Sequence, residues 1–263
     1  MTALPKILVA PTGARRGKSD HPALPVTIEE IVDTCRACAM AGAGGVHAHV
    51  RADDGSHSLD LERYRTLVER LETELPGWFV QVTSEAAGRY TAADQRTLIR
   101  SLKPRAVTAA IRELVPDAKS EAEAKSLYHW ACDNGVTIQH ICFDETDMNR
   151  LVGFIKDGTI PGRSHQVQLV LGSYDGRKVS RPEDIEAFIE PMLALKDTQD
   201  FDWMLCAFGR EETDCLLRTL ELGGKARIGF ENSLWHRDGS VARDNAERVE
   251  ELVTLARSSG LDI

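Results

Sequence analysis

Short apolar runs alternate with longer amphipathic segments along almost the whole chain. Each apolar run has the length of a buried β-strand, about 4–8 residues. The runs fall at residues 7–10, 44–51, 78–83, 106–109, 136–143, 166–171, 201–207 and 226–230. After each run, apolar residues recur at the 3.6-residue spacing of a helix packed on one face. The pattern therefore predicts strands and helices in strict alternation.

Capping residues support the predicted helices. Thr27 with Glu30 three positions later forms a capping box, and Gly42 provides a stop for the first helix. The later helical patterns cover about 64–75, 91–102, 127–135, 145–156, 185–193, 216–224 and 246–256.

Eight strand–helix pairs in a row, without a linker, favour a closed parallel barrel. We therefore expect an α/β protein, a (β/α)8 TIM barrel, forming a single catalytic domain over residues 1–263. An open doubly wound sheet is the alternative. Such a sheet normally carries a glycine-rich G-x-G-x-x-G turn after its first strand, and residues 11–15 (Pro-Thr-Gly-Ala-Arg) do not match it.

Composition narrows the class of protein. Hydrophobic residues make up 42% and charged residues 28% of the chain, which is ordinary for a soluble protein. The net charge of -9 argues against a nucleic-acid binder. No apolar run approaches the roughly 20 residues of a membrane span, and the N-terminus lacks a signal-peptide core. The six cysteines show no disulfide framework, and Cys35 and Cys38 fall in a helical pattern as core residues. A cytoplasmic enzyme without membrane or nucleic-acid partners is expected.

The run at residues 44–51 carries chemistry. Because side chains alternate along a strand, His47 and His49 share one face. Two imidazoles spaced in this way can bind one divalent ion, at about 2.0–2.1 Å each for zinc. A pair of ordinary histidines with separate hydrogen bonds is the alternative.

The barrel adds a third metal ligand. Active sites of this fold lie where strands end, and in a closed barrel the last and second strands flank the first. Glu231 can therefore join His47 and His49, giving a set typical of catalytic sites. Other polar residues at strand ends are Arg15, Thr83, Ser84, Glu85, Thr108, Arg112, Gln139, His140, Asp144, Arg210, Glu211, Arg227 and Asn232. His140 could be a further ligand but more readily fits a buried structural role. His57, His129, His165 and His236 are expected on the surface.

Several stretches resemble the β-keto acid cleavage enzymes, whose type member cleaves 3-keto-5-aminohexanoate. They are residues 10–14 (APTGA), 24–30 (LPVTIEE), 41–51 (AGAGGVHAHVR), 54–55 (DG), 171–172 (LG), 223–232 (GGKARIGFEN) and 245–246 (NA). The likeness covers nearly the whole chain, although the middle third matches poorly.

The resemblance implies a metal-dependent barrel, usually with zinc, and a homo-oligomer. It further implies condensation of a β-keto acid with acetyl-CoA, giving acetoacetate and a shortened acyl-CoA. The metal ligands of the family fall on His47, His49 and Glu231, and its catalytic arginine falls on Arg227. A catalytic hydroxyl falls on Thr83, where the type member has serine.

The chain departs from the family at the catalytic carboxylate, which falls on Asn232, an amide that cannot accept a proton. If the chemistry is retained, another base is needed, and Glu85 and Glu211 are candidates. Asn232 keeps its place in the predicted catalytic set. A metallohydrolase with the same histidines, or a ligand-binding barrel without catalysis, are the alternative functions.

Further departures concern the substrate. Arg15 stands where the type member has glutamate, suited to an amino substrate, so we hypothesise a substrate with a second acidic group. The loop at 108–116 lacks the usual asparagine and glycine, and Arg112 is either a compensating anion contact or a solvated helix-start residue. We predict that Arg15, Ser84, Thr108 and Arg112 bind the substrate.

Overall fold

The structure is a computed structural model that describes residues 2–263, and its strands close into a parallel barrel. Within that range the barrel strands are β1 (Ile7–Val9), β2 (Gly45–Ala48), β5 (Phe79–Thr83), β6 (Ala106–Ala110), β7 (Thr137–Cys142), β8 (Ser164–Leu171), β9 (Asp200–Ala207) and β10 (Lys225–Ile228). Strand β1 pairs in parallel with both β10 and β2, which closes the ring. The predicted TIM barrel is confirmed.

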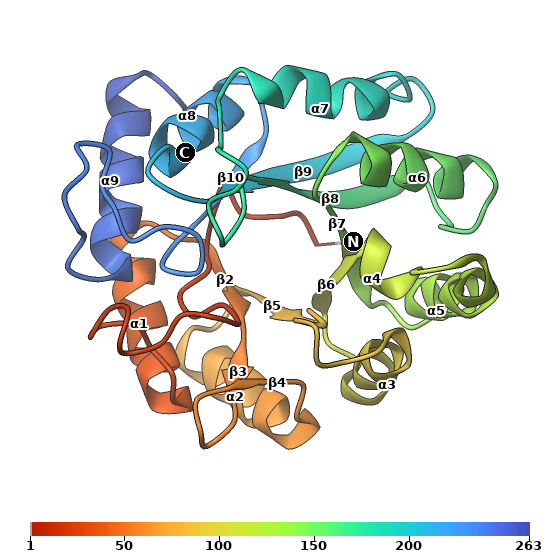
Figure 1. Cartoon of the computed structure of the whole chain (residues 1–263), viewed down its shortest axis with the longest axis horizontal. Helices are drawn as coiled ribbons and strands as arrows, with labels where there is room; N and C mark the ends of the chain where they lie inside the picture. Colours follow the sequence, from red (N-terminus) through yellow and green to blue (C-terminus); the bar gives the residue numbers. More distant parts are fainter. Residues whose placement is uncertain (1) are drawn as a thin grey trace.

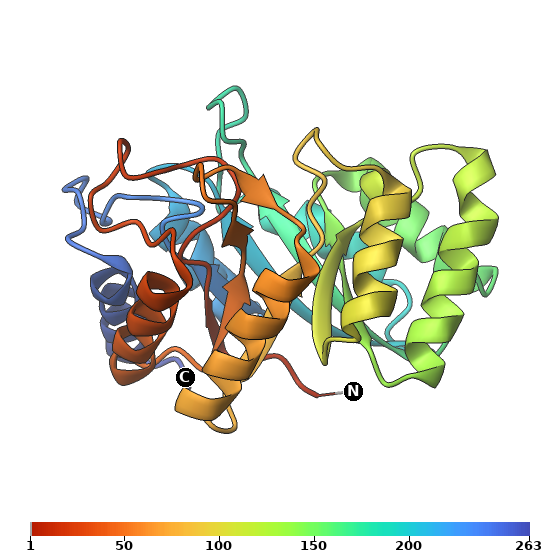
Figure 2. The same cartoon turned by 90° about the horizontal axis from the view of Figure 1, so that it is seen from below.

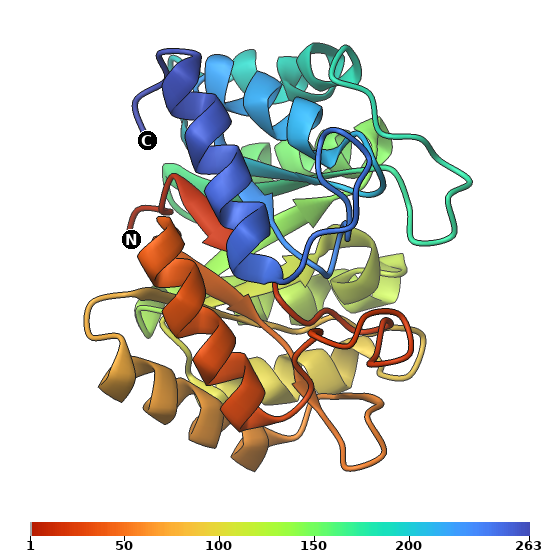
Figure 3. The same ribbon diagram turned by 90° about the vertical axis from the view of Figure 1, so that its left-hand side faces the viewer.

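Helices surround this ring on its outer side (Figure 1). They are α1 (Ile28–Ala41), α2 (Leu61–Glu74), α3 (Ala92–Leu102), α4 (Ile111–Leu114), α5 (Glu121–Asp133), α6 (Glu145–Lys156), α7 (Asp184–Leu193), α8 (Glu212–Glu221) and α9 (Asn245–Ser258), with a 3-10 turn at Ala118–Ser120. Helices α1 and α9 lie side by side over the part of the barrel wall that contains β1 (Figure 3). This helix pair brings the first and last parts of the chain together. None of the described helices is long and apolar enough to cross a membrane.

Local sequence explains where α1 begins and ends. The Thr27 side chain accepts a hydrogen bond from the backbone of Glu30, and the Glu30 side chain accepts one from the backbone of Thr27. Gly42 ends the helix in the left-handed region, at φ 111°, where a residue without a Cβ is favoured. The predicted capping box and stop are both confirmed.

Side chains on the two faces of the strands form different layers. Outward-facing residues such as Val46, Val107 and Leu205 pack against the helices in the main apolar core. Inside the barrel, Leu8 and Met204 form a small apolar cluster near the amino ends of the strands. The buried Gln166 lies at the same end, where its Nε2 donates to Thr2 O at 2.8 Å. Above this cluster the interior is polar, with the buried Gln81 and Gln139 joined by a hydrogen bond of 2.8 Å. This polar layer lies directly below the site described next.

The loops that follow the strands gather at one end of the barrel, and both termini lie at the other (Figure 2). The prediction of one continuous strand over residues 44–51 was wrong in one respect, because the strand is interrupted at His49. Beyond the break, β3 (Val50–Arg51) pairs with β4 (His57–Ser58) in an antiparallel hairpin. The chain leaves the barrel here because Arg51 binds the loop after β1: its Nε donates to Gly13 O at 2.9 Å, and its Nη2 donates to Arg16 O at 2.8 Å.

Candidate metal centre and active site

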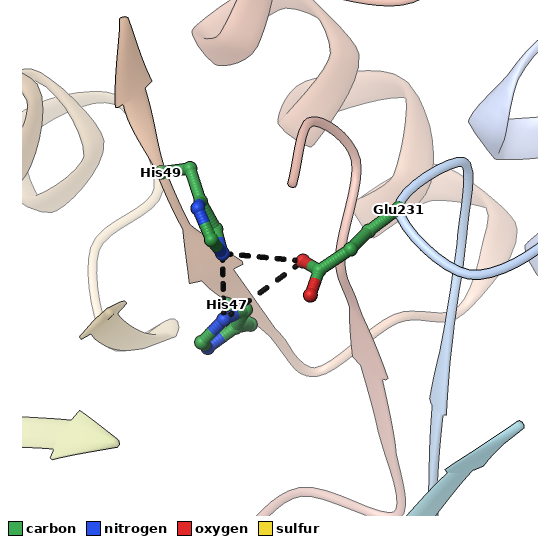
Figure 4. A group of neighbouring side chains, drawn as sticks. All are labelled: His47, His49 and Glu231. Carbon is green, nitrogen blue, oxygen red and sulfur yellow. Dashed lines mark hydrogen bonds and ion pairs between the residues drawn. The ribbon is translucent and has the colours of Figure 1, made fainter. Parts of the chain in front are cut away.

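Two imidazoles and one carboxylate converge at the loop-bearing end of the barrel (Figure 4). His47 Nε2 lies 3.1 Å from His49 Nε2. Glu231 Oε2 lies 3.8 Å from His47 Nε2 and 3.4 Å from His49 Nε2. Their three side chains are buried, with at most 5% of any one exposed. The structure therefore brings together the three residues predicted to bind a metal.

The fold places these side chains from distant parts of the sequence. Strands β2 and β10 lie on either side of β1, so the histidines and Glu231 reach the same end of the barrel with one strand between them. Gly13, at φ 61°, packs directly on Glu231: a Cβ at position 13 would lie 2.6 Å from Glu231 Cγ. A glycine is required there because any larger residue would displace the carboxylate.

The donor set fits a divalent cation. Ligand atoms about 2.05 Å from a tetrahedral ion lie roughly 3.4 Å apart, close to the three separations observed. Glu231 Oε2 is a buried oxygen for which the described residues provide no hydrogen-bond donor. Two nitrogens and a carboxylate oxygen leave a fourth position open for a substrate, as in catalytic zinc sites.

The glutamine layer orients His47. Gln81 Oε1 lies 2.9 Å from His47 Nδ1, and Gln81 Nε2 donates to Gln139 Oε1 at 2.8 Å. Since the Gln81 amide nitrogen donates to Gln139, its oxygen accepts the proton of His47 Nδ1. The lone pair of His47 Nε2 then faces His49 and Glu231, as metal binding requires. Burial, with the nearby Arg227 charge, lowers the pKa of His47 to about 3, which keeps the ring neutral.

Arg227 provides the positive charge of the site. Its Nη2 donates to Glu231 Oε1 and to Cys206 Sγ, both at 3.1 Å. Burial opposes ionisation of Glu231, but the Arg227 guanidinium outweighs it and holds the pKa of Glu231 well below its usual range. Glu231 is therefore ionised, and only one of its oxygens is committed to the arginine.

A cavity opens beside the three ligands and includes two of them. It is lined by His47, Thr83, Glu85, Ala110, Glu113, Ile141, Phe143, Val170, Tyr174, Phe208, Arg227 and Glu231. The polar and charged lining residues lie on the β2, β5 and β10 side, together with Glu113 of α4. The apolar residues come mostly from β6 to β9. The cavity thus combines a charged end for a carboxylate or carbonyl with an apolar wall.

The predicted catalytic residues take different places around this cavity. Thr83 lines it, and its Oγ1 accepts a hydrogen bond from Glu85 N at 3.0 Å. Asn232 is fully buried but is not among the cavity-lining residues. Both polar atoms of its amide lack a partner within residues 2–263. Thr83 and Arg227 are thus brought to the cavity with the metal ligands, whereas Asn232 is not.

The residues predicted to bind substrate are also spread out. Arg15 is exposed, with its guanidinium 5.0 Å from the ring centre of Tyr174, a cavity-lining residue. Ser84 Oγ donates to the carbonyl of Thr108 at 2.7 Å, away from the cavity lining. Arg112 Nε donates to Asp147 at 2.8 Å, and its Nη2 bonds with Asp144 at the start of α6. The Arg112 guanidinium also lies 5.0 Å from the ring centre of Phe143, which lines the cavity. Arg15 and Arg112 therefore both lie against cavity-lining rings, but the carboxylates of Asp144 and Asp147 already neutralise Arg112.

Sequence reasoning missed the arginines that brace the site. Arg16 Nη1 donates to the carbonyls of Phe230, at 2.7 Å, and of Glu231, at 3.1 Å. Arg51 binds the same β1–α1 loop through the carbonyls of Thr12, Gly13 and Arg16. Both contacts involve backbone oxygens far away in sequence, so no local pattern could have indicated them.

Two histidines expected on the surface are buried, and that prediction was wrong for them. His57 is 3% exposed, because its Nε2 donates to Glu85 O at 2.8 Å and ties the hairpin to the loop after β5. His165 is 2% exposed and faces the helices from β8. His140 also points outward, toward Tyr128 of α5, so it cannot join the metal ligands. Cys35 and Cys38 are core residues, as predicted.

Solved structures of low sequence identity share the fold. A ternary complex of ObcA with a C4-CoA adduct and oxalate superposes with a TM-score of 0.70 at 16% identity, and the match covers 91% of this chain. This chain spans 65% of the ObcA chain. A type I 3-dehydroquinate dehydratase from Clostridium difficile gives a TM-score of 0.60 at 11% identity, covering 98% of this chain and 94% of the other. These likenesses support the barrel alone.

Curated relatives are similar in sequence over nearly their full length. A protein from Cupriavidus necator named 3-oxoadipate:acetyl-CoA acetyltransferase is 28% identical over 97% of this chain and 89% of its own. A 3-keto-5-aminohexanoate cleavage enzyme from Fusobacterium nucleatum is also 28% identical, over 98% of this chain and 93% of its own. A 3,5-dioxohexanoate:acetyl-CoA acetone transferase from Paraburkholderia graminis is 25% identical over 98% of this chain and 91% of its own.

The sequence profile of the beta-keto acid cleavage enzymes matches residues 6–263. The match includes the barrel strands and all three candidate metal ligands. The resemblance seen in the sequence motifs is therefore confirmed: this chain belongs to the β-keto acid cleavage enzyme family.

Proposed function

We propose that the enzyme exchanges acyl groups between a β-keto acid and acetyl-CoA. The CH2–COO⁻ unit of the β-keto acid passes to the acetyl group, giving acetoacetate, and the remaining acyl group passes to CoA. The convergence of His47, His49 and Glu231 beside a cavity that also contains Arg227, in a member of this family, is the observation that supports the proposal.

We further propose a divalent ion, zinc being the best fit to two imidazoles and a carboxylate, held by His47, His49 and Glu231. Bound there, it would act as a Lewis acid toward the substrate oxygens. The Arg227 guanidinium, already fixed by Glu231 and Cys206, is placed to stabilise a second oxyanion. The Thr83 hydroxyl supplies a further hydrogen bond at the cavity wall. Asn232 occupies the position of the family carboxylate, but its amide is not a base.

The substrate is proposed to carry a second acidic group. Arg15 is exposed, its guanidinium lies 5.0 Å from the ring centre of the cavity-lining Tyr174, and within residues 2–263 it forms no ion pair with a carboxylate. The Cupriavidus necator relative is named for 3-oxoadipate, which has two carboxylates, whereas the equally similar Fusobacterium nucleatum relative is named for an amino substrate. Overall identity therefore does not decide between these substrates, and the charge of Arg15 favours the dicarboxylate. Ser84, Thr108 and Arg112 stay predictions as substrate contacts.

A panel of β-keto acids tests the proposal. Purified enzyme is incubated with acetyl-CoA and either dicarboxylic or amino β-keto acids, and acetoacetate and the new acyl-CoA are quantified. We expect turnover that requires acetyl-CoA, is abolished by a chelator and returns with added zinc. Arg15→Glu should move the preference toward amino substrates. Preference of the unaltered enzyme for amino substrates would contradict the assigned role of Arg15, and absence of acetoacetate throughout would contradict the proposed reaction.

Three further proposals rest on the sequence and the family resemblance. They are a single catalytic domain over residues 1–263, a cytoplasmic location and a homo-oligomeric assembly. Light scattering of the purified protein tests the last of these.

A further inference from the structure

The proposed reaction requires a base, and the position expected to supply it is an amide. Asn232 cannot accept a proton and does not line the cavity. Among the described residues, the carboxyl groups that do line it are Glu85, Glu113 and the candidate ligand Glu231. Glu211, the other base considered from the sequence, is exposed at the start of α8 and lies outside the cavity. The choice is therefore between Glu85 and Glu113.

Glu113 is already engaged in holding the loop after β5. Its Oε2 accepts hydrogen bonds from Ala86 N at 3.0 Å and from Gln95 Nε2 at 2.9 Å. These donors stabilise the ionised carboxylate and fix its position. Glu113 is thus suited to supporting the cavity wall rather than to exchanging protons with a substrate.

Glu85 has the opposite arrangement. Its backbone is fixed from both sides, because its N–H donates to Thr83 Oγ1 at 3.0 Å and its carbonyl accepts from His57 Nε2 at 2.8 Å. No hydrogen bond to its carboxylate is formed within the described part of the chain. Thr83, two residues earlier, faces the same cavity. A fixed backbone with a free carboxylate is the arrangement that a general base requires.

Electrostatics agree with this role but do not separate the two carboxyl groups, because burial also raises the pKa of Glu113. Burial raises the pKa of Glu85, and the negative charges of Glu231 and Glu113 add to this effect against His49 and Arg15. A raised pKa makes the carboxylate a stronger base near neutral pH.

We propose, on the basis of the function proposed above, that Glu85 is the catalytic base of this enzyme. Its carboxylate takes a proton from C2 of the β-keto acid, the carbon between the keto and carboxylate groups. The electron pair of the C–H bond stays on the substrate, and C2 bonds to the thioester carbon of acetyl-CoA while the C–S electron pair leaves with CoA. The CoA thiolate then bonds to the original keto carbon, the bond from that carbon to C2 breaks, and the proton on Glu85 returns to C2 of acetoacetate.

Glu85→Gln tests this role because it keeps the shape of the side chain and removes its basicity. The first measurement is exchange of the C2 protons of the β-keto acid in D2O without acetyl-CoA, corrected for the uncatalysed rate. The second is kcat for acetoacetate formation. We expect both rates to fall by about 10²–10⁴-fold, with bound metal unchanged. Glu85→Ala should lose the same activity and recover part of it with added formate.

Two carboxylate variants act as controls. Glu211→Gln removes a carboxylate outside the cavity and should behave like the unaltered enzyme. Glu113→Gln makes the same change within the cavity, and loss of exchange in this variant with exchange retained in Glu85→Gln would overturn the proposal. If the unaltered enzyme forms acetoacetate and Glu85→Gln does so equally fast, the role of Glu85 is disproved while the proposed function stands. An unaltered enzyme without acetoacetate formation would disprove the function itself.

Discussion

Two buried arginine–glutamate pairs in this barrel have opposite electrostatic behaviour. At the mouth of the barrel, Arg227 contacts Glu231 at 3.1 Å. In the outer layer, Arg248 of α9 contacts Glu212 of α8 at 2.8 Å, with both side chains fully buried. The pairs have the same chemistry and similar distances, so their surroundings must account for any difference between them.

The difference lies in what else surrounds each carboxylate. For Glu212, burial outweighs the Arg248 charge and raises the pKa to about 7. For Glu231, the Arg227 charge outweighs burial, and the pKa falls well below its usual range. Arg248 also bonds to Thr213 and Glu251, which links α8 to α9. One pair therefore joins two helices, and the other holds a negative charge next to the imidazoles of His47 and His49.

Removing a metal ligand should have the largest effect on activity. We expect His49→Ala to lower acetoacetate formation by at least about 10³-fold, because Lewis-acid stabilisation of the transition state is worth several kcal/mol. Elemental analysis should show loss of the bound metal, and the circular dichroism spectrum should stay unchanged. Full activity in a metal-free variant would contradict the assigned role of the site.

Breaking the Arg248–Glu212 pair should lower the stability of the fold and leave the catalytic rate unchanged. Arg248→Met leaves Glu212 buried without its partner, which should cost about 3–5 kcal/mol in the free energy of unfolding. Urea denaturation followed by circular dichroism measures this loss. The kcat of the folded fraction should stay close to that of the unaltered enzyme, and a large drop in kcat would mean that the two pairs are not separate in function.

Gln81 connects the metal centre to the barrel interior, so its removal should have an intermediate effect. Gln81→Leu removes the hydrogen bond that orients His47. Metal affinity should fall by about 10–100-fold, as for other residues that orient ligands. Competition with a chromogenic chelator measures the affinity. Unchanged affinity would show that His47 is held by packing alone.

The raised pKa of Glu212 predicts a modest pH dependence of stability. The folded protein keeps a proton on Glu212 up to about pH 7, whereas the unfolded chain loses it near the ordinary value of 4.5. The folded state is therefore favoured by this group below pH 4.5, and that contribution is lost as the pH rises toward 7. Glu212→Gln should show a smaller decline in urea midpoint between pH 5 and pH 7 than the unaltered protein. Equal declines in the urea midpoint of the two proteins would argue against a raised pKa of Glu212.

Much of the fold and of the metal site could be predicted because both follow from local periodicity. Alternation placed His47 and His49 on one face, and barrel closure put Glu231 beside them. The break at His49 could not be predicted, since it depends on Arg51 reaching carbonyls some 40 positions earlier in the chain, such as Thr12. The burial of His57 has a similar cause, a backbone contact to Glu85 across two loops.

The choice of the proposed catalytic base shows a second limit of prediction from the sequence. Glu85 and Glu211 are equivalent in the sequence, since each follows a strand by a few residues. Only the three-dimensional arrangement separates them, because one faces the cavity and the other faces solvent. Hydrophobic patterning defines which strand end a residue occupies, but not the direction of a side chain within an irregular loop.

The contact between Gly13 and Glu231 has a consequence for how such an enzyme can change over time. The loop after β1 is attached through its carbonyl oxygens, which every amino acid possesses, and through one glycine pressed against the last ligand. Arg15, two positions further on, takes no part in that attachment. With the substrate role proposed for Arg15, mutation at position 15 would redirect the enzyme to a different acyl chain while the candidate metal ligands stay undisturbed, so new substrates would become accessible by single-residue steps.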